Sequence, residues 1–72
     1  MTKVKAKELA PGDMVERSQW IASEGFVTEL RLVVSNISLD NLQHIEWLRI
    51  KKNEVCTSYL NQNDELFVVG RA

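Results

Sequence analysis

The chain has a single cysteine, Cys56, and no long apolar run. One cysteine excludes an internal disulfide, and a secreted domain of this size usually needs such bonds, so we expect a reducing, cytoplasmic setting. The lysine-bearing amino terminus lacks the apolar stretch that follows in a signal peptide. The longest apolar clusters, such as residues 32–34, are far too short to span a membrane, and we expect no membrane partner.

Neither sign of charge dominates the sequence. Nine lysines and arginines oppose ten aspartates and glutamates, which leaves a net charge of −1. A dedicated duplex-binding domain usually has a marked basic excess, so this balance argues against that role. With 72 residues, 44% of them hydrophobic and 26% charged, the chain has the composition of a small globular protein. We interpret residues 1–72 as a single small domain with a thin margin of stability.

The most informative stretch is Leu9–Val15, which reads Leu-Ala-Pro-Gly-Asp-Met-Val. Its Pro11–Gly12 pair predicts a type II turn, because proline sets φ at the first central position and glycine takes the positive φ required at the second. The segment before this turn alternates between lysines and small apolar residues, which predicts an edge strand. The outward lysines of that strand are Lys3, Lys5 and Lys7.

Short alternating segments then predict strands through most of the chain. Residues 17–25 fit either a short helix or a hairpin, and we favour the hairpin because strands surround it. Residues 26–37 form the longest predicted strand, and residues 38–42 indicate a loop or one helical turn. Residues 66–69 indicate a last, buried strand.

A second hairpin is predicted around Lys52–Asn53, between strands at residues 45–51 and 54–60. This turn places Lys51 opposite Glu54. The next cross-strand pair, one step away from the turn, is Ile50 opposite Val55. Five or six short strands joined by tight turns predict an all-β barrel or roll. We expect the core to comprise Leu9, Val15, Leu30, Leu32, Val34, Leu48, Ile50, Val55, Phe67 and Val69.

With its Leu-x-Pro-Gly-Asp-x-Val motif, this strand pattern resembles the small SH3-like β-barrel proteins of bacteria and phages. The resemblance implies an SH3-like barrel of five or six antiparallel strands. It also implies a binding module, since proteins of this class bind peptides, RNA or DNA or serve as assembly parts.

No catalytic set is evident in the sequence. His44 and Glu46 are two residues apart on one predicted strand, where they share a face, and an acid–base pair or a metal site is one hypothesis for them. A metal site needs three or four ligands, however, and we expect Cys56 on the opposite face of the hairpin. No serine lies in a nucleophile elbow and no glycine-rich loop precedes a helix. We therefore expect no enzyme, no metal and no cofactor.

An aromatic cluster carries the leading hypothesis. Trp20, Ile21 and Phe26 either plug one end of the barrel or form an exposed apolar patch for a partner protein. A domain this small has few apolar residues to spare, and self-association would add burial. We predict a non-catalytic protein-interaction or accessory module of a bacterium or phage, whose partner is another protein or a second copy.

The alternative is a single-stranded nucleic-acid-binding barrel. Trp47, Arg49 and Lys51 alternate on the predicted strand 45–51, so they share a face. If that face points outward, the tryptophan is free to stack on a base while the cations meet phosphate, with the amino-terminal lysines extending the patch. If it points inward, the hypothesis loses its stacking residue.

Overall fold

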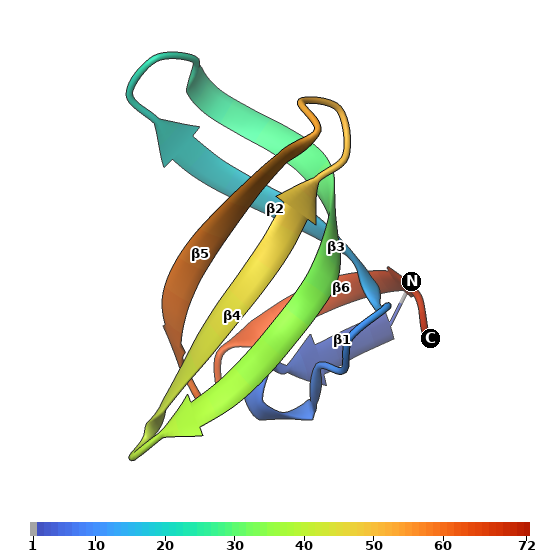
Figure 1. Cartoon of the computed structure of the whole chain (residues 1–72), viewed down its shortest axis with the longest axis vertical. Helices are drawn as coiled ribbons and strands as arrows, with labels where there is room; N and C mark the ends of the chain where they lie inside the picture. Colours follow the sequence, from blue (N-terminus) through green and yellow to red (C-terminus); the bar gives the residue numbers. More distant parts are fainter. Residues whose placement is uncertain (1) are drawn as a thin grey trace.

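The computed structural model describes residues 2–72, which form one six-stranded antiparallel sheet (Figure 1). The strands lie in the order β1-β6-β2-β3-β4-β5, so β1 and β5 are the two edges. The elements are β1 Thr2–Lys5, the 3₁₀ turn η1 Ala6–Glu8, β2 Met14–Ile21, β3 Gly25–Leu39, β4 Leu42–Arg49, β5 Glu54–Asn61 and β6 Glu65–Gly70. The predicted all-β class is confirmed, but the sheet is not closed into a barrel.

The motif at residues 9–15 forms the predicted turn. The Asp13 N–H donates to the Ala10 carbonyl at 3.0 Å, and Gly12 has a φ of 95°. The carboxylate of Asp13 is buried and accepts hydrogen bonds from the Ala10 N–H and the Ala72 N–H, both at 2.9 Å. One aspartate therefore joins this turn to the carboxyl end of the chain. Lys7 belongs to η1 and not to the strand predicted before the turn.

The hairpin predicted at residues 17–25 is confirmed. β2 and β3 are paired from Met14 opposite Leu32 to Ile21 opposite Gly25. The segment 38–42 differs from its prediction, because β3 runs on to Leu39 and β4 begins at Leu42. Only two residues remain in this turn. Asp40 takes a φ of 55°, a left-handed conformation that the short polar side chain of aspartate tolerates.

The β4–β5 hairpin is present, but its predicted register is wrong by two residues. Arg49 is opposite Glu54 and Leu48 is opposite Val55, so Lys51 is not in the ladder. The turn is longer than the two residues expected. The Asn53 N–H donates to the Ile50 carbonyl at 3.3 Å, and Asn53 has a φ of 52°. A wider turn moves the strand pairing down without changing which residues share a face.

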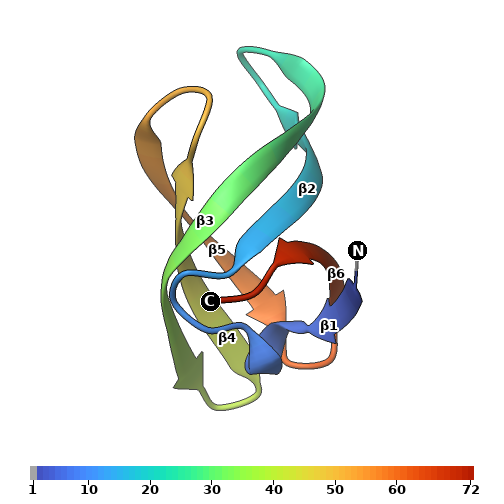
Figure 2. The ribbon, with the colours of Figure 1, turned by 90° about the vertical axis from the view of Figure 1, so that its right-hand side faces the viewer.

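The sheet bends strongly around β3, where the register shifts between Val33 and Ser35. Such a bulge increases the local twist and bend of a strand. Turned by 90°, the molecule shows the β2–β3 and β4–β5 hairpins diverging toward their tips (Figure 2). The bend gives the sheet an inner face, which holds the core, and an outer face turned to solvent.

The core lies on the opposite face of β3 and β4 from the one predicted. Of the expected core residues, the structure buries Leu9 and Val15 and half-buries Leu32 and Leu48. The six others are exposed: Leu30, Val34, Ile50, Val55, Phe67 and Val69. The buried apolar residues are Val4, Ala6, Leu9, Val15, Val33, Ile45, Trp47, Leu60, Leu66 and Val68.

Charge compensation explains this reversal. Both faces of β3 and β4 carry apolar side chains, so the period of two does not select one of them. The inner face includes Arg31 and Arg49, which are usually assigned to solvent, but both are paired with Glu29. Paired in this way, the arginines are tolerated inside, where the guanidinium group of Arg31 lies 5.7 Å from the centroid of the buried Trp47 ring.

Candidate interaction surfaces

Trp20 and Phe26 form an exposed aromatic pair at the tip of the β2–β3 hairpin. They are directly opposite each other in the register, one pair before the loop. Trp20 is 68% exposed and Phe26 is 70% exposed. The loop that positions them is tight, with the Glu24 N–H donating to the Ile21 carbonyl at 2.9 Å and Gly25 at a φ of 82°. The pair lies on the surface and does not plug the sheet.

Ile21, the third residue of the predicted cluster, is separated from this pair. It directly follows Trp20 on β2, so its side chain faces the other side of the hairpin. There it lines a cleft of about 190 Å³ between β2 and β5, together with Gln19, Arg31, Arg49 and residues 56–58. The structure thus brings together two of the three predicted interface residues.

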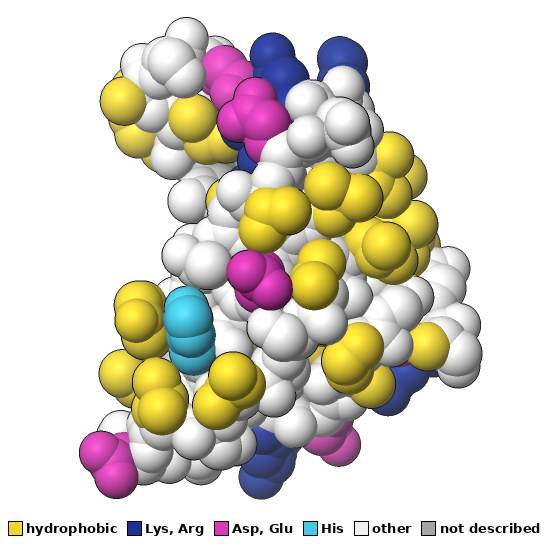
Figure 3. All heavy atoms as spheres, in the orientation of Figure 1, with side chains coloured by type: hydrophobic (Ala, Val, Ile, Leu, Met, Phe, Trp, Pro, Cys, Tyr) yellow, Lys and Arg dark blue, Asp and Glu magenta, His cyan; other side chains and the backbone are white. Residues whose placement is uncertain are grey.

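An apolar row crosses the outer face of the sheet, and its members are residues predicted to lie in the core. Leu32 is opposite Leu48, and Leu48 is opposite Val55, so three strands contribute to it. Leu30 and Ile50 extend the row at 44% and 42% exposure. Figure 3 shows hydrophobic side chains gathered on the right of the molecule, over β3 and the β4–β5 tip.

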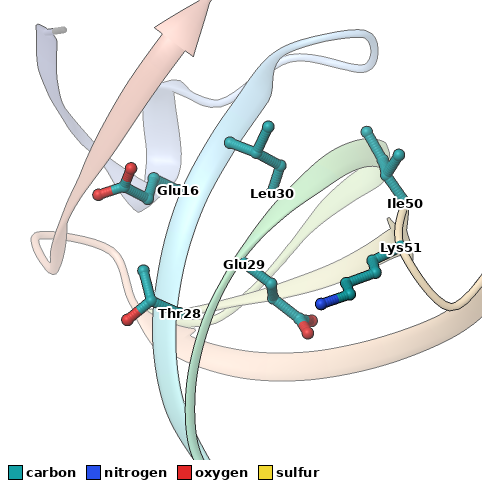
Figure 4. A pocket seen from close by; sticks show the side chains of 6 residues that line it. All are labelled: Glu16, Thr28, Glu29, Leu30, Ile50 and Lys51. Carbon is teal, nitrogen blue, oxygen red and sulfur yellow. The ribbon is translucent and has the colours of Figure 1, made fainter.

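This row borders a hollow of about 320 Å³ (Figure 4), lined by Glu16, Thr28, Glu29, Leu30, Ile50 and Lys51. Leu30 and Ile50 supply its apolar side. The charged ends of Glu29 and Lys51 point toward one another at its other side. Such an apolar site with a few polar groups at its margin is the usual form of a binding surface.

A cluster of charged side chains lies on the inner face of the sheet and consists of Glu24, Glu29, Arg31 and Arg49. Arg49 donates from Nε and Nη2 to both oxygens of Glu29, at 2.7 and 2.9 Å, and from Nη2 to Glu24 at 3.0 Å. Arg31 donates from Nε to Glu29 at 2.8 Å. The bonds from Arg49, and next those from Arg31, outweigh burial and hold the pKa of Glu29 at about 2. Glu29 in turn raises the pKa of Arg49 above its ordinary value.

Trp47 lies in this interior and is fully buried. The guanidinium groups of Arg17 and Arg31 are each 5.7 Å from the centroid of its ring, at cation–π distance. The Trp47 Nε1–H donates to the Ser58 hydroxyl at 3.1 Å. Burial, followed by the like charge of Arg31, lowers the pKa of Arg17. The cluster acts as a polar extension of the core.

The residues predicted for nucleic-acid binding do not form one surface. Trp47 and Arg49 are buried, while Lys51 is exposed in the β4–β5 turn. The exposed amino-terminal lysines Lys3, Lys5 and Lys7 lie on β1 and η1, away from that turn (Figure 1). Of the two orientations that the sequence left open for strand 45–51, the structure has the inward one, with Trp47 in the interior.

The residues considered for catalysis are also apart. His44 lies on the outer face, where its ring stacks on Tyr59 with centroids 4.6 Å apart. Glu46 shares that face, whereas Cys56 is opposite Trp47 and lines the inner cleft. Within residues 2–72, no three potential metal ligands converge.

No helix in the described part of the chain has the length and apolar character needed to cross a membrane. Comparison with protein families, with curated proteins and with solved structures finds no match to this chain. The arrangement of its own residues is therefore the basis for assigning a function.

Proposed function

We propose that this protein is a non-catalytic interaction module that docks onto a partner protein through Trp20 and Phe26. The observation that carries the proposal is the exposure of two large aromatic side chains side by side on one hairpin. Aromatic residues in such positions are enriched among the residues that dominate binding energy at protein interfaces. A protein of this size gains little from leaving both in water unless a partner covers them.

The surface around the pair supports the same proposal. Next along the outer face of the hairpin come Ser18 and Thr28, whose hydroxyls are 2.8 Å apart. Beyond them lies the hollow bordered by Leu30 and Ile50. A partner that covers the pair and reaches the hollow would meet two apolar sites separated by hydroxyl groups. That composition matches a non-obligate interface, which is apolar in parts and polar between them.

The strand pattern and the motif at residues 9–15 support a further part of the proposal, that the protein is one of the SH3-like small barrels. We also place it, as a proposal, among the cytoplasmic accessory proteins of a bacterium or phage. The single-stranded nucleic-acid hypothesis is not carried forward, because no observation favours it once Trp47 is buried.

The test is to replace the pair and to follow folding and binding separately. Trp20→Ala and Phe26→Ala remove exposed side chains. The free energy of unfolding of each variant should therefore differ from that of the parent protein by no more than about 1 kcal/mol. Both should lose a partner that the immobilised parent protein retains from an extract of its own cells. Phe67→Ala is the matched control, since Phe67 is an exposed aromatic residue on β6.

Two results would count against this function. Unfolding of both single variants would show that the pair is structural. Equal retention of the partner by the parent protein and both variants would show that the partner binds elsewhere.

A further inference from the structure

The free edge of β5 is the strongest unexplained feature of the fold. β5 pairs with β4 over its full length without a register shift, and in residues 2–72 no strand pairs with its other side. An unpaired edge presents backbone N–H and C=O groups that can bind another strand. Natural proteins usually protect such edges with lysines, prolines or bulges.

β5 has none of these protections. Its sequence is Glu-Val-Cys-Thr-Ser-Tyr-Leu-Asn, in which the only charge is Glu54 at the start. β1, the other edge of the sheet, carries Lys3 and Lys5. The two edges of one sheet therefore differ: one is protected against pairing and the other is open to it.

The side chains of β5 are complementary to a second copy of the same strand. Directly opposite residues of two antiparallel strands project to the same side of the sheet. A twofold axis perpendicular to the sheet at Thr57 places Val55 opposite Tyr59 of the second copy, and Tyr59 opposite its Val55. These residues are 59% and 63% exposed in the single chain. Pairs of an aromatic and a β-branched residue are among the stabilising cross-strand pairs.

The remaining positions fit the same register. Thr57 meets its own copy, and threonine pairs form favourable cross-strand contacts. Cys56 is opposite Ser58 on the inner face, and Glu54 is opposite Leu60, so no like charges meet. An axis at Cys56 would place Tyr59 opposite the turn residue Asn53, and an axis at Ser58 would place Val55 opposite Asn61, so neither brings Val55 and Tyr59 together. The register centred on Thr57 covers both exposed side chains.

We propose that this chain forms a symmetric homodimer in which two β5 strands pair antiparallel about Thr57 and join the two sheets. Within each chain Val55 is opposite Leu48, and Tyr59 is opposite and stacked on His44. Dimerisation therefore extends the outer apolar row from one copy into the next. Trp20 and Phe26 lie on the other hairpin, so this proposal and the proposed docking surface can fail independently.

The test uses Thr57→Lys, which places two lysines against each other at the twofold axis. Within its own chain the new side chain is opposite Glu46, so the fold should be retained. Sedimentation from micromolar to millimolar protein should show a reversible dimer for the parent protein. The dissociation constant should rise at least about fivefold in the variant. Thr2→Lys, on the other edge strand β1, is the matched control and should dimerise like the parent protein.

Cross-linking tests the register. In a Cys56→Ser background, Thr57→Cys should form an intermolecular disulfide on mild oxidation, because opposite Cα atoms on paired strands lie within disulfide range. Val55→Cys should not, because its opposite residue is Tyr59. A parent protein that stays monomeric throughout, a dimer insensitive to Thr57→Lys, or equal cross-linking at both positions would overturn the proposal.

Discussion

Arg49 holds Glu29 by two hydrogen bonds, from Nε to Oε2 at 2.7 Å and from Nη2 to Oε1 at 2.9 Å. Arg31 is directly opposite Arg49 in the register and donates a third bond to the same carboxylate. One carboxylate thus binds both inward-facing arginines, and Glu24, which also pairs with Arg49, supplies the second negative charge. This relationship allows the charged face of β4 to be the inner face, which leaves the apolar side chains of the opposite face exposed.

Removal of Glu29 should strongly destabilise the protein. Glu29→Ala leaves Arg31 without its carboxylate partner in the interior, and breaking such a pair typically costs about 3 kcal/mol. Urea denaturation followed by circular dichroism measures the loss. Glu16→Ala, on the outer face of β2, is the matched control and should change the free energy of unfolding by about 0.5 kcal/mol or less. Equal effects of the two substitutions would contradict the assigned pairing.

Acid should destabilise the protein through the same carboxylate. Because the pKa of Glu29 is held at about 2, below its ordinary value of 4.5, the folded state keeps this group ionised where the unfolded chain protonates it. Its contribution is fully present above pH 4.5 and is lost as the pH falls from there toward 2. Thermal unfolding across that range should show this loss. The melting temperature of Glu29→Gln should change less with pH over this range than that of the parent protein.

Asp13 should be required for stability, because its buried carboxylate joins two distant parts of the chain. Asp13→Ala leaves the Ala10 and Ala72 N–H groups without their acceptor, which should lower the free energy of unfolding by about 1–3 kcal/mol. Glu65→Ala removes an exposed carboxylate whose ion pair with Lys3 spans 3.9 Å, and about 0.5 kcal/mol or less is expected. Chemical denaturation of both variants distinguishes a buried anchor from a surface charge. Similar values would refute the anchoring role.

The two tryptophans should report opposite environments. Trp47 is fully buried and Trp20 is mostly exposed. In a Trp20→Phe variant the remaining fluorescence should be blue-shifted and weakly quenched by iodide, whereas in a Trp47→Phe variant it should be red-shifted and readily quenched. If the second variant does not fold, the first still tests the orientation of β4. Ready quenching of Trp47 in the folded Trp20→Phe variant would restore the nucleic-acid hypothesis.

The strands and most turns were predictable because they depend on local chemistry. The turn at Pro11–Gly12 needs only a proline and a glycine in order, and the β2–β3 hairpin follows from its strand-rich surroundings. The β4–β5 register was not predictable in the same way, because Asn53 alone does not determine how many residues the turn contains. A longer turn with the same residues shifts the register by two.

The inner face was predicted wrongly because the deciding contacts are not local. Arg31 on β3 and Arg49 on β4 are 18 positions apart in the chain, and Glu24 lies in the loop between β2 and β3. The sequence shows their charges but not their convergence. Alternation alone selects neither face when both carry apolar residues. Of the two alternatives for Trp20 and Phe26, a plug or an exposed patch, the structure shows the exposed patch, and their role as an interface stays a prediction.

The most direct test of the docking surface is photo-cross-linking in the cells that produce the protein. A photoreactive phenylalanine analogue at position 26 should form a discrete adduct with one partner protein, identified by mass spectrometry, and the additional substitution Trp20→Ala should abolish it. The same analogue at position 67, on β6, should give no such adduct. No adduct at position 26, or the same adduct from both positions, would contradict the assignment of Trp20 and Phe26 as the site of docking.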